Sequence, residues 1–183
     1  MTFPRLIINA LVAAVLCGIP VVASAQSTVD DLLDRLANPD LRNWSVVEEE
    51  VRQRWSISGS ATADYLLRRG QEALEVEDYD AAYDHLTALV DHAPEFAEGW
   101  NARATMFFMQ QMYGPAIADL QRVLALEPRH FEALTGLGIM LEDMGDQDRA
   151  LQAYEAAHAI HPQQPDILRL VEDLRVQLEG EAL

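Results

Sequence analysis

Two groups of side chains in this sequence have types and spacings that could bind a metal ion. His158 and His161 lie three residues apart, so a helix would place both imidazoles on one face, as in some transition-metal sites. Met106, Met109 and Met112 repeat this spacing, and thioether sulfur is a ligand for Cu(I). However, His161 immediately precedes Pro162 at the expected end of the helix, and Met106 is expected to point toward neighbouring helices. We therefore predict no metal or cofactor: the histidines are read as residues favoured at a helix C-terminus, and the methionines as packing residues.

The sequence also lacks the patterns typical of a catalytic centre. It contains no nucleophile elbow, no glycine-rich loop that could hold a phosphate and no zinc-protease helix. Acidic runs such as Glu48-Glu49-Glu50 are read as a solvated helix face. We expect no enzymatic activity, so the residues must serve binding or structure.

The charge of the chain restricts its partners. There are 30 acidic and 13 basic residues, the basic ones are all Arg, and the net charge is -17. Nucleic acid and anionic lipid surfaces both require a basic face, and no basic run occurs. A neutral or cationic partner fits this charge.

Residues 1–25 differ in composition from the rest of the chain. Arg5 precedes an apolar run over residues 6–22, and Ala23-Ser24-Ala25 has the small-x-small pattern of a signal peptidase site. We predict a signal peptide cleaved after Ala25, with an uncleaved anchor as the alternative. Removal of the leader would also remove Cys17, the sole cysteine, and leave no stable membrane insertion. Together with the Lys-free, Ala- and Arg-rich composition, this favours the periplasm of a bacterium.

A fixed 34-residue period organises the remainder. Pro94, Pro128 and Pro162 recur at this spacing, and so do Trp100, Leu134 and Leu168. With each proline at the thirty-second position, the units are 63–96, 97–130 and 131–164. Small residues fall at the eighth and twentieth positions in every unit: Gly70, Ala104 and Gly138, then Ala82, Ala116 and Ala150. Small side chains at these two positions are what two antiparallel helices need where their backbones come closest.

These units resemble the tetratricopeptide repeat (TPR) family. The second unit carries the most signature residues, which are Trp100, Ala104, Phe107, Tyr113, Ala116, Leu120 and Pro128. The first unit departs from the pattern, because Arg69 and Ala73 stand where a leucine and an aromatic residue are usual. The resemblance implies an all-α fold: a right-handed solenoid of three helical hairpins with a capping helix over 165–183.

Residues 26–60 precede the repeats and are expected to form a helical pair. The first helix starts near Ser27–Asp30 and is stopped by Asn38-Pro39, and Ser45–Glu48 reads as a capping box for the second. The second helix would carry an apolar stripe made of Trp44, Val47, Val51 and Trp55. This pair is interpreted as a cap or a decayed repeat.

The TPR resemblance also implies a binding groove on the concave face formed by the first helix of each unit. The implied groove residues are Leu67, Gln71, Leu74, Asn101, Thr105, Phe108, Met109, Thr135 and Ile139. Glu75, Glu98 and Glu132 would form an acidic rim. Chaperone-binding members of the family use Lys, Arg and Asn to hold a terminal carboxylate, and a Lys-free chain disfavours that ligand. The alternative is that the terminal helix or the N-terminal pair covers the groove floor.

Taken together, the sequence predicts an exported, periplasmic TPR scaffold that binds another envelope protein, or a peptide segment of one, with basic edges. The alternative is a self-associating structural protein of the envelope, a homo-oligomer in which the repeats stack end to end or the stripe of Trp44 and Trp55 forms a dimer face.

Overall fold

The computed structural model describes residues 28–181, so the predicted leader and its cleavage site lie outside the described part. Within these residues the chain is helical and contains no strand. The helices are α1 (Val29–Leu36), α2 (Trp44–Trp55), α3 (Ala61–Glu75), α4 (Tyr79–His92), α5 (Ala97–Met109), α6 (Tyr113–Leu126), α7 (Phe131–Asp143), α8 (Gln147–Ile160) and α9 (Pro165–Glu181). In this range no helix is both long enough and apolar enough to cross a membrane.

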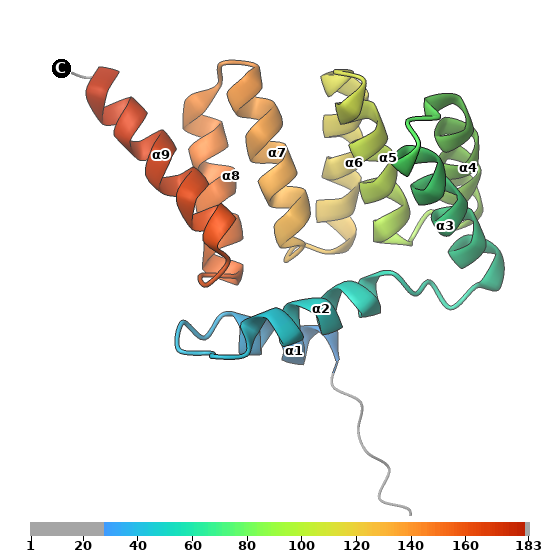
Figure 1. Ribbon diagram of the computed structural model, residues 1–183, viewed down its shortest axis with the longest axis horizontal. Helices are drawn as coiled ribbons and strands as arrows, with labels where there is room; N and C mark the ends of the chain where they lie inside the picture. Colours follow the sequence, from blue (N-terminus) through green and yellow to red (C-terminus); the bar gives the residue numbers. More distant parts are fainter. Residues whose placement is uncertain (1–27, 182–183) are drawn as a thin grey trace, which may run out of the picture.

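Three antiparallel hairpins stand side by side and form the body of the molecule (Figure 1). They are α3–α4, α5–α6 and α7–α8, one for each repeat unit, and the all-α solenoid predicted from the sequence is confirmed. The last helix, α9, packs on α8 through Val171 and Leu174, which join Leu141 and Tyr154 in a core cluster. The array therefore continues through α9 at its C-terminal side.

The hairpins are closed by the small residues that the repeat pattern singled out. A Cβ atom added at Gly70 would lie 2.4 Å from Leu86 Cδ2, and one at Gly138 would lie 2.4 Å from Tyr154 Cε1. Leu86 and Tyr154 occupy the same position in the second helix of their units. The ring of Tyr154 is fully buried, and its hydroxyl donates to Glu142 Oε2 at 2.8 Å. A small residue at the eighth position is thus required by direct helix contact.

The turn inside each hairpin repeats one backbone geometry. Glu77, Gln111 and Gly145 occupy the same place in successive units and have φ values of 56°, 59° and 81°. This left-handed conformation is free for glycine and costs other residues about 1 kcal/mol. The following aspartates, Asp78 and Asp146, cap the second helices by accepting from backbone N–H groups. The period thus fixes the turns as well as the core.

The N-terminal pair begins differently from the prediction. The capping box lies at α1, where Thr28 and Asp31 exchange side-chain to backbone hydrogen bonds. The prediction of a capping box at Ser45–Glu48 is wrong, because α2 starts at Trp44 and Ser45 is already inside the helix. Glu48 is instead buried and pairs with Arg52 at 2.8 Å. Its carboxylate is buried and paired with Arg52, so it does not cap the helix.

The pair also does not stack on the first repeat as a further repeat would. Helices α1 and α2 lie across the lower ends of the upright helices in Figure 1, beneath α7 and α8. Their apolar side chains share a core cluster with Phe131, Ala157 and Ile167. Polar contacts fix the same placement, since Arg129 donates to Asp34 at 2.8 Å and Gln163 donates to the backbone oxygens of Asn38 and Pro39. The interpretation as a decayed repeat is therefore wrong, and the pair is a brace across repeats two and three.

Candidate functional site

The predicted groove residues lie on α3, α5 and α7, and the structure places them at different depths. Gln71, Thr105 and Met109 are exposed. Leu67 is buried, and the half-buried group comprises Leu74, Asn101, Phe108, Thr135 and Ile139. Because only 3% of Leu67 is exposed, this residue supports the floor from within the core and offers no surface to a ligand.

The hydroxyl groups of the two groove threonines donate hydrogen bonds to backbone carbonyls of their own helices. Thr105 donates to the carbonyl of Asn101 at 3.0 Å, and Thr135 donates to the carbonyl of Phe131 at 2.8 Å. A Thr hydroxyl has one donor, so neither can donate to a ligand without breaking this bond. Toward a ligand these positions act mainly as methyl groups and acceptors.

The upper part of the groove is aromatic and apolar. The rings of Phe108 and Tyr113 lie 6.1 Å apart, and Met109 is 44% exposed. The Tyr113 hydroxyl donates to Asp143 Oδ2 at 3.1 Å and so joins the second repeat to the third. Phe108 is held against a ring that is itself anchored, which makes it a rigid contact for an apolar ligand group.

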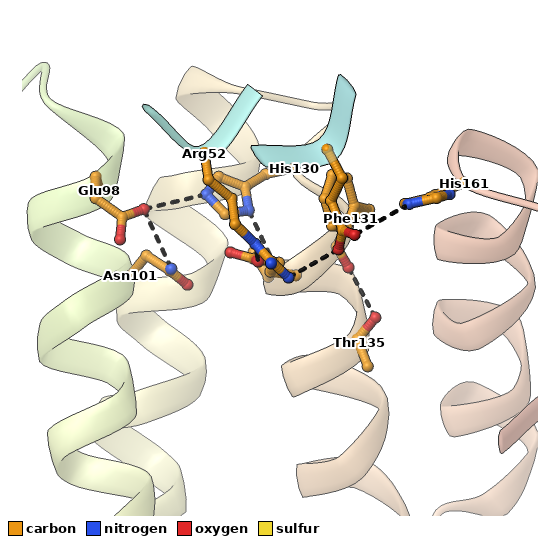
Figure 2. Close-up of polar contacts among 10 residues, drawn as sticks. Arg52, Glu98, Asn101, His130, Phe131, Thr135 and His161 are labelled. Atoms are coloured by element: carbon orange, nitrogen blue, oxygen red, sulfur yellow. Dashed lines mark hydrogen bonds and ion pairs between the residues drawn. The ribbon is translucent and has the colours of Figure 1, made fainter. Parts of the chain in front are cut away.

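The lower end of the groove contains residues of α2 that the repeat pattern does not predict. Arg52 donates from Nε to Glu132 Oε1 at 2.6 Å, so a side chain of the N-terminal pair reaches the first turn of α7 (Figure 2). The same guanidinium pairs with Glu48, and desolvation of Glu48 raises the pKa of its carboxyl group. The spacing of Glu48 and Arg52 on one helix was visible in the sequence, but their contact with the groove was not.

Two cavities flank Arg52. One has a volume of about 300 Å³ and is lined by Glu49, Arg52, Gln53, Trp55, Ser56, Gln71, Glu98 and Glu132. The other, about 240 Å³, is lined by Arg52, Phe131, Glu132, Thr135, Gly136, Ile139, Gln164, Asp166 and Ile167. Residues of the N-terminal pair, such as Arg52, and of the terminal helix, such as Ile167, thus border the lower end of the groove. The linings of these two cavities do not include Phe108 or Met109, which lie at the other end.

Glu98 is the most buried carboxylate of the predicted rim. Its side chain is 15% exposed, and its Oε2 atom accepts from Asn101 Nδ2 at 3.3 Å (Figure 2). The same oxygen lies 3.5 Å from Nε2 of His130, a ring that is fully buried. Asn101 therefore has a partner already, and its amide orients Glu98 at the edge of the cavity.

Two buried histidines form the surface on which α2 packs. Trp55 stacks on His130 with a ring separation of 4.0 Å and an interplanar angle of 8°. Trp44 contacts His161 edge to face at 5.3 Å. The interpretation of His161 as a residue favoured by the helix dipole is wrong, because burial lowers its pKa to about 4 and disfavours the charged form. Its function is to pack, as a neutral ring, against the N-terminal pair.

We expect this burial to make the fold less stable in acid. The pKa of His161 lies below the value of about 6.5 for a solvated histidine, so its contribution to the free energy of unfolding is fully present above pH 6.5. That contribution is lost as the pH falls toward 4, by up to about 3 kcal/mol. Glu48 lies 3.8 Å from His161 Nε2 and has a raised pKa, so its protonation favours the folded state and opposes the effect of His161. The charges of Arg52 and His158 lower the pKa of His161, as burial does.

The measurement is the free energy of unfolding between pH 7.5 and 4.5 for the natural protein and for His161→Phe. The variant should lose less stability over this range, because the phenyl ring cannot take up a proton. Equal pH dependence in the two proteins would show that His161 does not control it.

No metal site is assembled in the part of the chain that the structure describes. Residues 28–181 contain no group of three or more His, Cys, Asp or Glu side chains placed to hold an ion. The three methionines are also separated, since Met106 is fully buried while Met109 and Met112 are exposed.

Comparison with known proteins agrees with the helical architecture. The tetratricopeptide repeat pattern matches residues 67–114 and 113–165. A TPR repeat-containing protein of Rhizobium etli is 33% identical over 159 residues, which are 86% of this chain and 78% of that protein. The chain belongs to the tetratricopeptide repeat family.

Solved TPR domains have the same fold. The TPR2B domain of yeast Sti1, in its complex with pHsp70, superimposes with a TM-score of 0.60 at 22% identity, covering 64% of this chain and 99% of that domain. The first TPR of Spaghetti (RPAP3), bound to the HSP90 peptide SRMEEVD, gives 0.63 at 21% identity and covers 66% and 95%. These likenesses show that the chain has the TPR fold.

Proposed function

We propose that this protein is an exported scaffold that holds a segment of another envelope protein in its concave groove. The observation that carries the proposal is the groove surface itself. Phe108 is half-buried and Met109 exposed toward the upper end of the groove, and the half-buried Ile139 lines a cavity with Glu132 at the lower end, where Glu98 also lies. An apolar strip with an acidic border fits a segment that has apolar side chains and basic edges, and opposite charge would speed its approach.

The charge of the groove disfavours a ligand like the peptide bound by one of the structural neighbours. The HSP90 peptide SRMEEVD on the first TPR of Spaghetti (RPAP3) contains three acidic residues. The present chain has no Lys and places Glu98 and Glu132 at its groove, so an acidic peptide would meet like charge. A basic or neutral segment is the better ligand.

Export to the periplasm forms part of the proposal. Its support is the sequence of residues 1–25, with Arg5, the apolar run and the Ala23-Ser24-Ala25 site. The proposed role is binding without catalysis, in keeping with the absence of catalytic motifs in the sequence. Cleavage after Ala25 is checked by N-terminal sequencing of the protein recovered from the periplasmic fraction.

Self-association through the tryptophan stripe has less support. Trp55 is 7% exposed, and Trp44 is engaged with His161. The stripe is thus covered by repeats two and three of the same chain. A homo-oligomer would need a different surface, and sedimentation velocity over a wide concentration range is the test for one.

The groove variant Phe108→Ala tests the binding proposal. We expect it to weaken capture of the partner at least tenfold, because an aromatic anchor at the centre of an interface commonly contributes about 2 kcal/mol or more. The measurement is quantitative co-purification of the partner with tagged protein after crosslinking in cells. Val176→Ala serves as the control, since Val176 is 69% exposed on α9 and lies outside the predicted groove set. Equal capture by the natural protein and Phe108→Ala would reject the groove.

A further inference from the structure

The cavity between α2 and the concave face is strongly acidic for its size. Its lining contains three carboxylates, those of Glu49, Glu98 and Glu132, and one cation, Arg52, in a volume of about 300 Å³. Arg52 already has two partners. Its Nε atom lies 2.6 Å from an oxygen of Glu132, and a terminal nitrogen lies 2.8 Å from an oxygen of Glu48. The lining therefore holds negative charge that Arg52 does not neutralise.

Glu98 is the most buried of these three carboxylates. No Arg side chain pairs with it anywhere in residues 28–181, and its contacts are the Asn101 amide and the His130 ring. Its side chain is nevertheless largely buried, with an exposed fraction of only 15%. A carboxylate removed from water in this way is destabilising unless a cation or several hydrogen bonds compensate it.

Two buried polar atoms at this place also lack partners. Nε2 of His130 points toward Glu98 and has no hydrogen bond, although the ring is fully buried (Figure 2). Trp55 lines the cavity, is only 7% exposed, and has an indole N–H without an acceptor. Native structures seldom leave such groups unpaired, so the polar groups beside Glu98 are incompletely satisfied within the chain.

We propose that this cavity is a recognition pocket for one cationic side chain, Arg or Lys, of the segment held in the groove. This inference rests on the proposed function and specifies the chemistry of its ligand. Glu98 is the main carboxylate that receives the cation, and Asn101 orients it. Charge-assisted hydrogen bonds in a site shielded from water are stronger than those at an open rim. The ligand would lie along α5 with its cation beside α2 and its apolar groups near Phe108.

The test uses two capped pentapeptides, Ala-Ala-Arg-Ala-Ala and the same sequence with citrulline, which keeps the shape of Arg and loses its charge. They are titrated at pH 7.5 into protein produced from the full sequence, while the Trp55 indole N–H resonance is followed by NMR. We expect a saturable shift with the Arg peptide and at least tenfold weaker binding of the citrulline peptide. Equal binding of the two peptides would overturn the pocket. So would the lack of a saturable shift up to about 20 mM peptide, because weaker binding than this amounts to very little free energy for an ion pair in a built site.

Two variants separate the pocket from general electrostatic attraction. Glu98→Gln is nearly isosteric and should weaken the Arg peptide at least tenfold, whereas Glu172→Gln, which removes an equal charge from an exposed site on α9, should change it less than twofold. Equal effects of the two variants would reject Glu98 as the site. Unchanged thermal unfolding verifies that Glu98→Gln is folded.

The outcomes also distinguish this inference from the proposed function. A cellular partner that depends on Phe108 but is insensitive to Glu98→Gln keeps the groove and rejects the pocket. A partner that depends on neither residue rejects the groove, even if the Arg peptide binds.

Discussion

Gly138→Ala should unfold at a temperature several degrees below that of the natural protein. The new Cβ would lie 2.4 and 2.5 Å from two carbons of the Tyr154 ring, closer than carbon atoms can pack. The ring cannot move aside easily, because it is fully buried and its hydroxyl is bound to Glu142. Overpacking of this kind costs about 1–3 kcal/mol, and we expect a net loss of about 2 kcal/mol, or about 4–8 °C.

The same helix provides the control. A Cβ at Gly136 would meet only Leu120 Cδ1, at 3.7 Å, which is ordinary van der Waals contact. Gly136→Ala should therefore gain about 0.5–1 kcal/mol from the higher helix propensity of alanine. Thermal or denaturant unfolding of both variants gives the comparison. A Gly138→Ala protein as stable as Gly136→Ala would contradict the close approach of α7 and α8.

Trp55→Ala should detach the N-terminal pair from the repeats. Trp55 is stacked on His130 and packs near Phe131 at 5.3 Å, and it is one of the largest side chains between α2 and the array. Truncation of a buried aromatic residue costs about 3–5 kcal/mol. Because the loss is local to the contact between α2 and α7, we expect amide hydrogen exchange over residues 28–56 to become much faster while α3–α9 keep their protection.

Val46→Ala on the same helix is the matched control, since Val46 is 64% exposed. It should change stability by less than about 0.5 kcal/mol and leave exchange in α1 and α2 unaltered. If the exchange of residues 28–56 were as slow in Trp55→Ala as in the natural protein, the brace would depend on other contacts. Loss of protection throughout the array would instead show that the repeats need the brace to fold.

The repeat period predicted most of the solenoid because each unit contacts mainly its neighbours along the chain. The regular spacing located the three hairpins, and the small residues at Gly70 and Gly138 predicted where the paired helices touch. Alignment of the three units also places Glu77, Gln111 and Gly145 at one turn position, which has a left-handed backbone in the structure. These features depend on local spacing and are therefore readable from one sequence.

The position of the N-terminal pair could not be obtained in this way. The stripe of Trp44 and Trp55 showed that α2 requires an apolar cover, but nothing in its spacing named the surface. That surface is built from His130, Phe131 and His161, which lie in or next to the turns between repeats and outside the repeating register of the core. Contacts between segments far apart in the sequence, such as Arg52 with Glu132, follow from the tertiary fold and not from a period.

The groove was predicted in part for the same reason. The family pattern located the helix faces that carry Phe108, Asn101 and Ile139, and these three residues are half-buried in the structure. It did not reveal that Leu67 is buried or that Arg52 and Trp55 close the lower end. The acidic rim was expected, but the burial of Glu98 depends on where α2 crosses the repeats.

Site-specific photocrosslinking in cells tests the central claim, that the concave groove holds another protein, most directly. A photoreactive residue is placed at Thr105, which is exposed on the groove side of α5, and in a separate control at Ala118, which is exposed on α6. We predict that Thr105 gives a reproducible crosslink to one envelope protein and that Ala118 does not, with the attachment site in an apolar segment that has Arg or Lys at its edge. Crosslinks only to a second copy of this chain, or equal crosslinks from both positions, would contradict the account.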